Sequence, residues 1–246
     1  MDTNTRTAGR MDRRHALGSL GAVGLTALFG PRALAALGED AQAATCVLTP
    51  EVTEGPYWID NTLTRRNITE GKPGMPLHIV FTVVNAKTCV PIKAADVEIW
   101  HADAAGEYSG YDSGTPAGPG GGPGGHATPT SSTRYLRGHQ RTNAGGRAEF
   151  LTVFPGWYSG RTPHIHMKVH VGGNVVHTGQ VFFNERITAA VYRTAPYRSR
   201  GQADTPHARD SIFAEAGGAR AELKLSRRGN GLRGYTGRIV VGVATA

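Results

Sequence analysis

Alternating apolar and polar residues, rather than a helical period, dominate the chain beyond residue 76. The run HIHMKVHV at 164–171 places Ile165, Met167 and Val169 on one face and polar side chains on the other, as in a half-buried strand. Helical signal is thin, and 207–216 is the one plausible short helix. Short strands separated by Gly- and Pro-rich turns predict an all-β fold, an antiparallel β-sandwich with long loops and little helix. Further strands are predicted at 77–84, 95–101, 147–153, 175–183 and 237–244.

The N-terminal segment has the composition of an export signal. Arg13 and Arg14 precede a Gly- and Ala-rich apolar run at 18–30, which is followed by small residues suited to cleavage. The paired arginines resemble a twin-arginine signal, and the apolar run is too short to cross a bilayer. We therefore predict a cleavable signal over 1–43 and one folded domain over 44–246, located in the periplasm or outside the cell, with no membrane span. A disordered basic tail is the alternative.

The charge balance argues against a nucleic-acid partner. The chain has 27 Lys and Arg against 19 Asp and Glu, a formal net charge of +8. Removing residues 1–43 takes away five arginines and four acids, which leaves +7. The remaining cations are scattered and no nucleic-acid motif accompanies them, so they indicate a solvated surface.

Cys46 and Cys89 are the only cysteines, and their even number fits an exported protein. A disulfide between them would close a loop of about 44 residues and contribute about 4 kcal/mol in the chain-entropy model. Two free buried thiols are the alternative. Neither residue lies in a Cys-x-x-Cys or Cys/His cluster, which argues against zinc.

His164 and His166 are the first candidates for chemistry. Residues i and i+2 of a strand point to the same face, so the two imidazoles can converge on one metal ion. His170 would lie about 13 Å beyond His166 at the rise of a strand, too far to bind the same ion. His101 alternates with apolar residues and is expected to lie in the core.

Ordered motifs extend this candidate site along the chain. W-H-x-D-x-x-G-x-Y-S spans 100–109, and P-G-x-Y-x-x-R-x-x-H-x-H spans 155–166. TEGPY at 53–57, LRGHQ at 136–140 and TGQVFF at 178–183 appear in the same order. Together these motifs resemble the intradiol ring-cleavage dioxygenases, which are non-haem ferric enzymes with a β-sandwich fold. The resemblance covers nearly all of the chain after the predicted signal.

The resemblance implies a ligand set and a catalytic set. Ferric iron, Fe(III), favours anionic oxygen, and a tyrosine ionises at neutral pH when a cation stabilises its phenolate. The implied iron ligands are Tyr108, Tyr158, His164 and His166, and the implied catalytic residues are Tyr158, Arg161 and Gln180. Taken singly, Tyr108 could be an ordinary half-buried aromatic residue, Arg161 a surface cation and Gln180 a plain polar strand residue.

The implied reaction inserts both atoms of O2 into a catechol-type aromatic and cleaves it between the two hydroxyl-bearing carbons, giving a cis,cis-muconate-type diacid. A homodimer is suggested by analogy alone. Two other interpretations stay open at this point. A cupin-like His-x-His enzyme would usually have a glutamate soon after the histidines, where this chain has 167–170, MKVH. A β-sandwich binding module without activity is the second alternative. The Gly- and Pro-rich loop at 113–132 is either a rim of the substrate pocket or an insertion.

Overall fold

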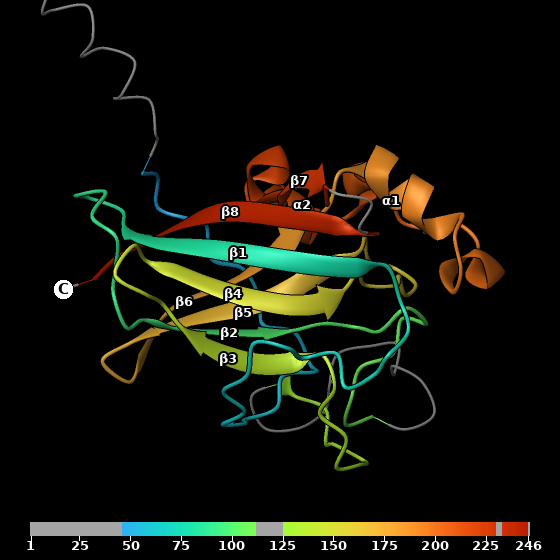
Figure 1. Ribbon diagram of the computed structural model, residues 1–246, viewed down its shortest axis with the longest axis horizontal. Coiled ribbons are helices and arrows are strands. Elements are labelled where there is room, and N and C mark those ends of the chain that lie inside the picture. Colours follow the sequence, from blue (N-terminus) through green and yellow to red (C-terminus); the bar gives the residue numbers. More distant parts are fainter. Residues whose placement is uncertain (1–45, 112–124, 230–232, 246) are drawn as a thin grey trace, which may run out of the picture. The chain divides into compact units, whose positions relative to one another are not determined.

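Two four-stranded β-sheets form the fold. The computed structural model describes residues 46–111, 125–229 and 233–245, so the predicted signal at 1–43 and residues 112–124 of the Gly- and Pro-rich loop lie outside them. Sheet A has the strand order β4-β1-β8-β7 and sheet B the order β3-β2-β5-β6. In Figure 1, β8, β1 and β4 run side by side in one layer. The strands are β1 (Pro76–Asn85), β2 (Asp96–Trp100), β3 (Arg137–Arg141), β4 (Arg147–Val153), β5 (His164–Val171), β6 (Asn174–Phe182), β7 (Lys224–Arg227) and β8 (Tyr235–Val243).

The predicted all-β sandwich is confirmed, and each predicted strand is present with its ends shifted by two residues at most. One pairing departs from the antiparallel expectation, because β1 and β8 pair in parallel. The sequence did not predict β3 or β7. Both are edge strands with polar sequences, RGHQR and KLSR, so neither shows the apolar alternation that marks a strand with one buried face.

Helices are few and short. The segment predicted at 207–216 divides into a 3-10 turn, η3 (His207–Arg209), and α2 (Ser211–Glu215). Asp210 separates them and caps α2, since its Oδ1 accepts from the backbone N–H groups of Ile212 and Phe213. The sequence pattern did not reveal α1 (Glu185–Tyr192), although Asn184 caps it and an acidic residue begins its first turn. Two further 3-10 turns are η2 (Tyr197–Arg200) and η4 (Gly218–Ala221).

The core lies between the two sheets. Phe81 and Phe150 of sheet A and Ile99, Ile165 and Met167 of sheet B are at most 1% exposed. Successive strand residues alternate between faces, so the neighbours of these sheet B residues point to the outer face of the sheet. That outer face is itself covered by residues 53–65, the covering segment, in which Trp58 Nε1 donates to Glu98 Oε1 and the Arg65 N–H donates to the His139 carbonyl. The predicted site residues of β5 therefore lie under this cover and outside the inter-sheet core.

The predicted disulfide is present and ties the N-terminal arm to the turn after β1. Cys46 and Cys89 have Cα atoms 5.3 Å apart and a sulfur–sulfur bond. Beside it, the arm extends sheet A, because Thr49 N–H donates to the Gly242 carbonyl at 2.9 Å. The arm that precedes the covering segment is thus anchored by a covalent bond and a strand-like pairing.

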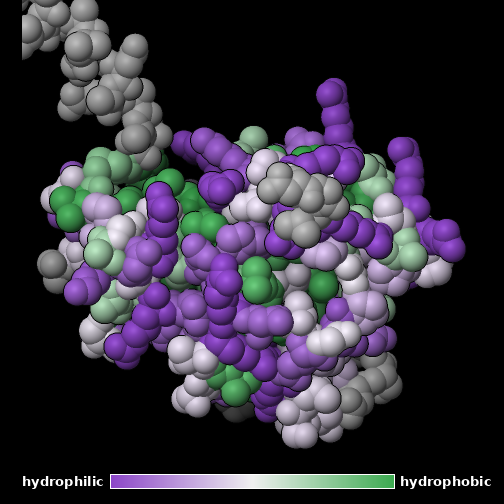
Figure 2. Space-filling model, viewed as in Figure 1, coloured by the Kyte–Doolittle hydropathy of each residue, from purple (hydrophilic) through white to green (hydrophobic). Residues whose placement is uncertain are grey.

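One face of the described surface fits the expectation of a solvated protein (Figure 2). Figure 2 shows a face that is mostly hydrophilic, with hydrophobic residues in small separate areas. Within the described ranges, no helix combines the length and apolar character that a bilayer crossing needs.

Candidate metal centre

Strand β5 begins with two histidines that point to the outer face of sheet B. His164 and His166 are 3% and 1% exposed, and their Nε2 atoms are 3.0 Å apart. His164 Nδ1 donates to the Thr162 carbonyl at 2.7 Å, which leaves the lone pair on Nε2. The His166 ring stacks on Trp100 with centroids 4.9 Å apart and 7° between the planes. Both rings are therefore held with Nε2 toward a common point.

Two tyrosines from separate loops complete this group. Tyr108 follows β2, and its Oη lies 3.0 Å from Nε2 of His166 and 3.4 Å from Nε2 of His164. Tyr158 precedes β5, and its Oη lies 3.2 Å from Nε2 of His164. The structure thus brings together all four residues that the sequence predicted as ligands.

The two tyrosine loops are locked together by close backbone contacts. Asp103 Oδ1 accepts from the N–H groups of Ala105 and Glu107, which shapes the turn before Tyr108. Gly106 has φ +80°, and a Cβ there would lie 2.1 Å from the Trp157 carbonyl oxygen. Because any larger residue would push the loops apart, this glycine fixes the separation of the two tyrosines.

We expect Gly106→Ala to lower the free energy of unfolding by about 1–3 kcal/mol, because it combines left-handed backbone strain with a backbone collision. It should also reduce iron bound per chain. Gly160→Ala is the matched control: Gly160 has φ +85°, but an added Cβ would meet nothing within 4 Å beyond its chain neighbours. Urea denaturation and iron analysis of both variants test this, and equal losses in the two would show that the loop contact is unimportant.

Burial sets the ionisation of the four groups. It raises the pKa of Tyr108 well above its usual range, with the nearby Tyr158 adding to the shift. It also raises the pKa of Tyr158, although the positive charge of Arg161 opposes this. For His164 and His166, burial lowers the pKa well below its usual range, and Arg161 lowers it further. At neutral pH, the protein alone thus holds two neutral imidazoles and two phenols that would ionise only beside a cation.

These residues fit a ferric ion. A metal–imidazole bond of about 2.0–2.1 Å puts adjacent ligands about 3 Å apart, which matches the Nε2 and Oη separations. Imidazole nitrogen suits iron, and phenolate oxygen suits a hard trivalent cation. Nε2 of His164 carries a lone pair and lies 3.0 Å from Nε2 of His166, an arrangement that one cation bound by both nitrogens would satisfy.

Arg161 lies beside the four groups and is held by two partners. Its Nε donates to Asp210 Oδ2 at 3.0 Å, and its Nη2 donates to Gln180 Oε1 at 2.6 Å. Gln180 in turn donates through Nε2 to the Thr53 carbonyl at 2.9 Å. These bonds fix the plane of the guanidinium group and link it to the TEGPY segment. The structure brings both Arg161 and Gln180 to the site, as the sequence predicted.

Asp210 is a site residue that the sequence did not predict; it lies 49 residues after Arg161 and is 4% exposed. Its Oδ2 accepts from Arg161 Nε and from the Thr162 N–H at 2.9 Å, while Oδ1 caps α2. One carboxylate therefore positions the arginine, the start of the histidine strand and a helix. One sequence signal could have pointed to Asp210: an aspartate just before a helix is a typical N-terminal cap.

Asp210→Asn is expected to lower kcat by about 10- to 100-fold and to change KM little, because an amide cannot accept at both positions and Arg161 loses its fixed orientation. Stability should fall by about 1–3 kcal/mol, the scale for an unsatisfied buried donor. Glu215→Gln, which also neutralises one carboxylate but at the exposed end of α2, is the control. Steady-state kinetics of both variants would refute the positioning role if they lose kcat equally.

A further buried cation supports Tyr108 through the neighbouring serine. Arg137, from the LRGHQ motif, is 1% exposed and donates to the hydroxyl and the carbonyl of Ser109, both at 2.9 Å. Burial lowers the pKa of Arg137 to about 10. The Tyr57 ring in turn stacks on the Tyr108 ring with centroids 4.7 Å apart. Tyr57 belongs to the TEGPY motif, and Arg137 had no predicted role beyond its place in the LRGHQ motif.

The described end of the Gly- and Pro-rich loop reaches the same region. His126 Nε2 is in hydrogen-bond contact with Glu54 Oε1 of the TEGPY motif, and the Ala127 carbonyl accepts from Tyr111 Oη at 3.2 Å. Glu54 also pairs with Lys168 of β5. Residues 125–132 therefore contact the rim of the site, which favours the pocket-rim interpretation for this part of the loop.

Two histidines are outside the group, as predicted. His101 is fully buried, donates through Nδ1 to the Ala102 carbonyl and receives a hydrogen bond from the Thr152 hydroxyl, each at 2.7 Å. Burial lowers the pKa of His101 to about 4, which keeps it neutral. His170 lies further along β5, where it faces Glu98.

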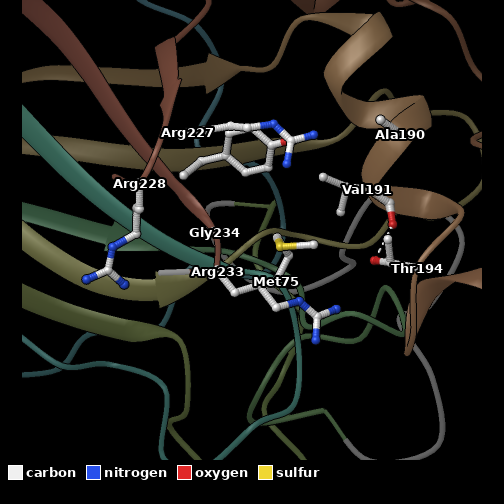
Figure 3. Close-up of a pocket in the computed structure, with 9 residues that line it drawn as sticks. Met75, Ala190, Val191, Thr194, Arg227, Arg228, Arg233 and Gly234 are labelled. Atoms are coloured by element: carbon white, nitrogen blue, oxygen red, sulfur yellow. Dashed lines mark hydrogen bonds between the residues drawn. The ribbon is translucent and has the colours of Figure 1, made fainter. Parts of the chain in front are cut away.

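A separate cavity of about 440 Å³ lies between α1, β7 and the start of β8, and no predicted ligand lines it. Figure 3 shows that the guanidinium groups of Arg227, Arg228 and Arg233 point in different directions. Because these cations do not converge, they do not form one anion site.

The fold and the site together define a class: a β-sandwich in which the side chains of two tyrosines and two histidines converge at one point. A family model described as Dioxygenase matches residues 49–195, more than half of the chain. An intradiol ring-cleavage dioxygenase from Tetranychus urticae has 35% identity and a TM-score of 0.74, over 81% of this chain and 95% of that one. The chain belongs to the intradiol ring-cleavage dioxygenase family.

Other relatives agree with this assignment. The dioxygenase domain of a dioxygenase and carbohydrate-binding fusion from Streptomyces sp. SirexAA-E has 26% identity and a TM-score of 0.55, over 81% of this chain and 99% of that domain. Catechol 1,2-dioxygenase 1 from Acinetobacter lwoffii is 30% identical over 115 residues, which is 45% of this chain. The match spans about a third of that relative's length, 32%.

Proposed function

We propose that this chain is a non-haem ferric intradiol dioxygenase that inserts both atoms of O2 into a catechol-type aromatic. The ring would open between the two hydroxyl-bearing carbons to give a cis,cis-muconate-type diacid. The observation that carries the proposal is the convergence of two imidazole nitrogens and two phenol oxygens, 3.0–3.4 Å apart, beside a fixed arginine. A ferric ion bound there would supply Lewis-acid activation of the catechol oxygens.

Tyr158 is the better placed of the two tyrosines to move a proton. Tyr108 is 1% exposed and stacked on Tyr57, whereas Tyr158 is partly exposed. The loop that carries Tyr158 also leads directly to Arg161. We assign to Tyr158 Oη, which would be a phenolate when a ferric ion is bound, the role of general base that accepts a proton from a catechol hydroxyl.

Arg161 would supply a fixed positive charge beside the reacting ring. Arg161 Nε donates to Asp210 and Arg161 Nη2 donates to Gln180. The guanidinium group is therefore oriented before substrate binds. A cation that needs no reorganisation stabilises negative charge as it develops on the ring. Gln180 therefore acts through Arg161, by holding it, and is a positioning residue.

Oxygen consumption with labelled gas tests the proposed reaction. Iron-loaded protein would be supplied with ¹⁸O2 and catechol, hydroxyquinol or protocatechuate, and the products analysed by mass spectrometry. We expect one O2 consumed per ring opened and both labelled atoms in the diacid from at least one substrate. Tight catechol binding without oxygen consumption would instead identify a binding module that has lost the activity.

We also propose that the chain is exported, by a signal over residues 1–43. The Cys46–Cys89 disulfide supports this, since such bonds persist in oxidising compartments. Cell fractionation of the wild type and of a variant with Arg13 and Arg14 both replaced by lysine tests it. Retention of both proteins in the cytoplasm would contradict export by this signal.

A further inference from the structure

A second cluster of ligand-type side chains lies on the outer face of sheet B, away from the candidate iron ligands. Glu98 of β2, His139 of β3 and His170 of β5 each offer one ligand atom, and these atoms lie within 4.8 Å of one another. Glu98 Oε1 is 3.6 Å from His139 Nε2, and Glu98 Oε2 is 3.4 Å from His170 Nε2. Three neighbouring strands thus direct a carboxylate and two imidazoles to one point.

His139 is already oriented as a metal ligand would be. Its Nδ1 lies 3.0 Å from Asp96 Oδ2, so the carboxylate accepts the Nδ1 proton and, in the neutral ring, Nε2 carries the lone pair. That Nε2 atom is buried and has no hydrogen-bond partner in the described part of the chain, and the residue is 8% exposed. A carboxylate behind a histidine fixes the tautomer and strengthens the metal bond.

Glu98 is a buried carboxylate whose contacts among the described residues include no permanent cation. It is 2% exposed, and Oε1 accepts from Trp58 Nε1 at 3.1 Å and Asn61 Nδ2 at 3.3 Å, which are both neutral donors. Lys168 stands opposite Glu98 in the strand pairing, but its ammonium group is paired with Glu54 and lies over the Trp58 ring. Buried carboxylates are normally paired with a cation or bound to a metal.

We propose that Glu98, His139 and His170 form a second metal site that takes a divalent cation such as Zn²⁺. Two imidazoles and one carboxylate suit zinc, and three protein ligands leave a fourth position for water. The His170 side chain is 20% exposed, which gives the ion a path from solvent. Because Trp58 and Asn61 hold Glu98, a metal here would tie the covering segment to three strands of sheet B.

A proton is the competing occupant of this cluster. Burial lowers the pKa of His139, but the hydrogen bond to Asp96 and the charge of Glu98 raise it above its usual value overall. An imidazolium could therefore balance Glu98 when no metal is bound. Zinc would displace that proton, so uptake of zinc by the proposed site should release protons into the buffer.

Zinc titration of the iron-loaded protein tests the site directly. We expect one Zn²⁺ per chain by elemental analysis with iron content unchanged, together with proton release by calorimetry in buffers of different ionisation enthalpy. Glu98→Gln keeps an acceptor for Trp58 and Asn61 but removes the charge, and should weaken zinc binding by about 100-fold or more. Asp96→Asn should weaken it by about 10- to 100-fold, because the negative charge behind His139 is removed.

His78→Gln is the matched control, since His78 pairs with Glu149 on sheet A, remote from the cluster. It should bind zinc as the wild type does. If Glu98→Gln does not fold, His170→Gln is the second variant, at a partly exposed position. The proposal is overturned if the wild type takes up no zinc, if zinc enters only as iron leaves, or if the cluster variants bind it like the control. None of these results depends on ring cleavage.

Discussion

Tyr108→Phe is expected to lower the rate of ring cleavage by about 1000-fold or more, because several kcal/mol of metal activation depend on this ligand. Tyr108 supplies the buried phenol oxygen that lies within reach of Nε2 of both His164 and His166. Phenylalanine removes this oxygen and retains the ring that stacks on Tyr57. Oxygen uptake with catechol measures the loss, and circular dichroism checks that the fold is retained.

Tyr111→Phe is the matched control for this variant. Tyr111 also packs against Tyr57, with ring centroids 5.1 Å apart, but its Oη donates to the Ala127 carbonyl. It should retain most of the ring-cleavage rate and all of the iron. A Tyr108→Phe protein as active as Tyr111→Phe would remove Tyr108 from the ligand set.

Arg161→Met is expected to lower kcat by about 100- to 1000-fold while iron stays bound, which is the range for removing one fixed donor from a site of developing negative charge. Methionine preserves much of the side-chain bulk but leaves Asp210 and Gln180 without their shared donor. Stopped-flow measurement of ring opening in single turnovers would separate this loss from any effect on product release.

Arg209→Gln controls for the general loss of positive charge near α2. Arg209 donates to the Asp204 carbonyl at 2.7 Å, which keeps its guanidinium group within its own segment. It should have nearly wild-type kcat. If Arg161→Met also has wild-type kcat, the guanidinium group has no part in the chemistry, and Asp210 and Gln180 lose their proposed role with it.

The sequence predicted the parts of the site that depend on local spacing. The i, i+2 relation of His164 and His166 follows from strand geometry alone, and it holds because Ile165 and Met167 fill the core face. The motif resemblance, rather than spacing, supplied Tyr108 and Arg161. These assignments bring residues from separate loops to one place, which a periodic pattern cannot do.

The sequence did not predict the contacts that depend on the order of the strands within a sheet. Glu98 faces His139 because β2 pairs with β3, and β3 lacks an apolar pattern that would have identified it. Its approach to His170 likewise requires β5 on the other side of β2. Asp210 reaches Arg161 only through the fold of the segment after β6. These contacts depend on which segments pack together in the folded protein. The pattern of residues along one sequence therefore does not predict them.

Whether two tyrosinates bind ferric iron here is tested most simply by the visible absorption spectrum of the iron-loaded protein, recorded before and after anaerobic addition of catechol. Tyrosinate bound to ferric iron gives a broad charge-transfer band and a red-brown colour. We predict this band for the wild type and a shift of the band when catechol binds. A protein that holds one iron per chain but is colourless would contradict the assignment of Tyr108 and Tyr158 as ligands.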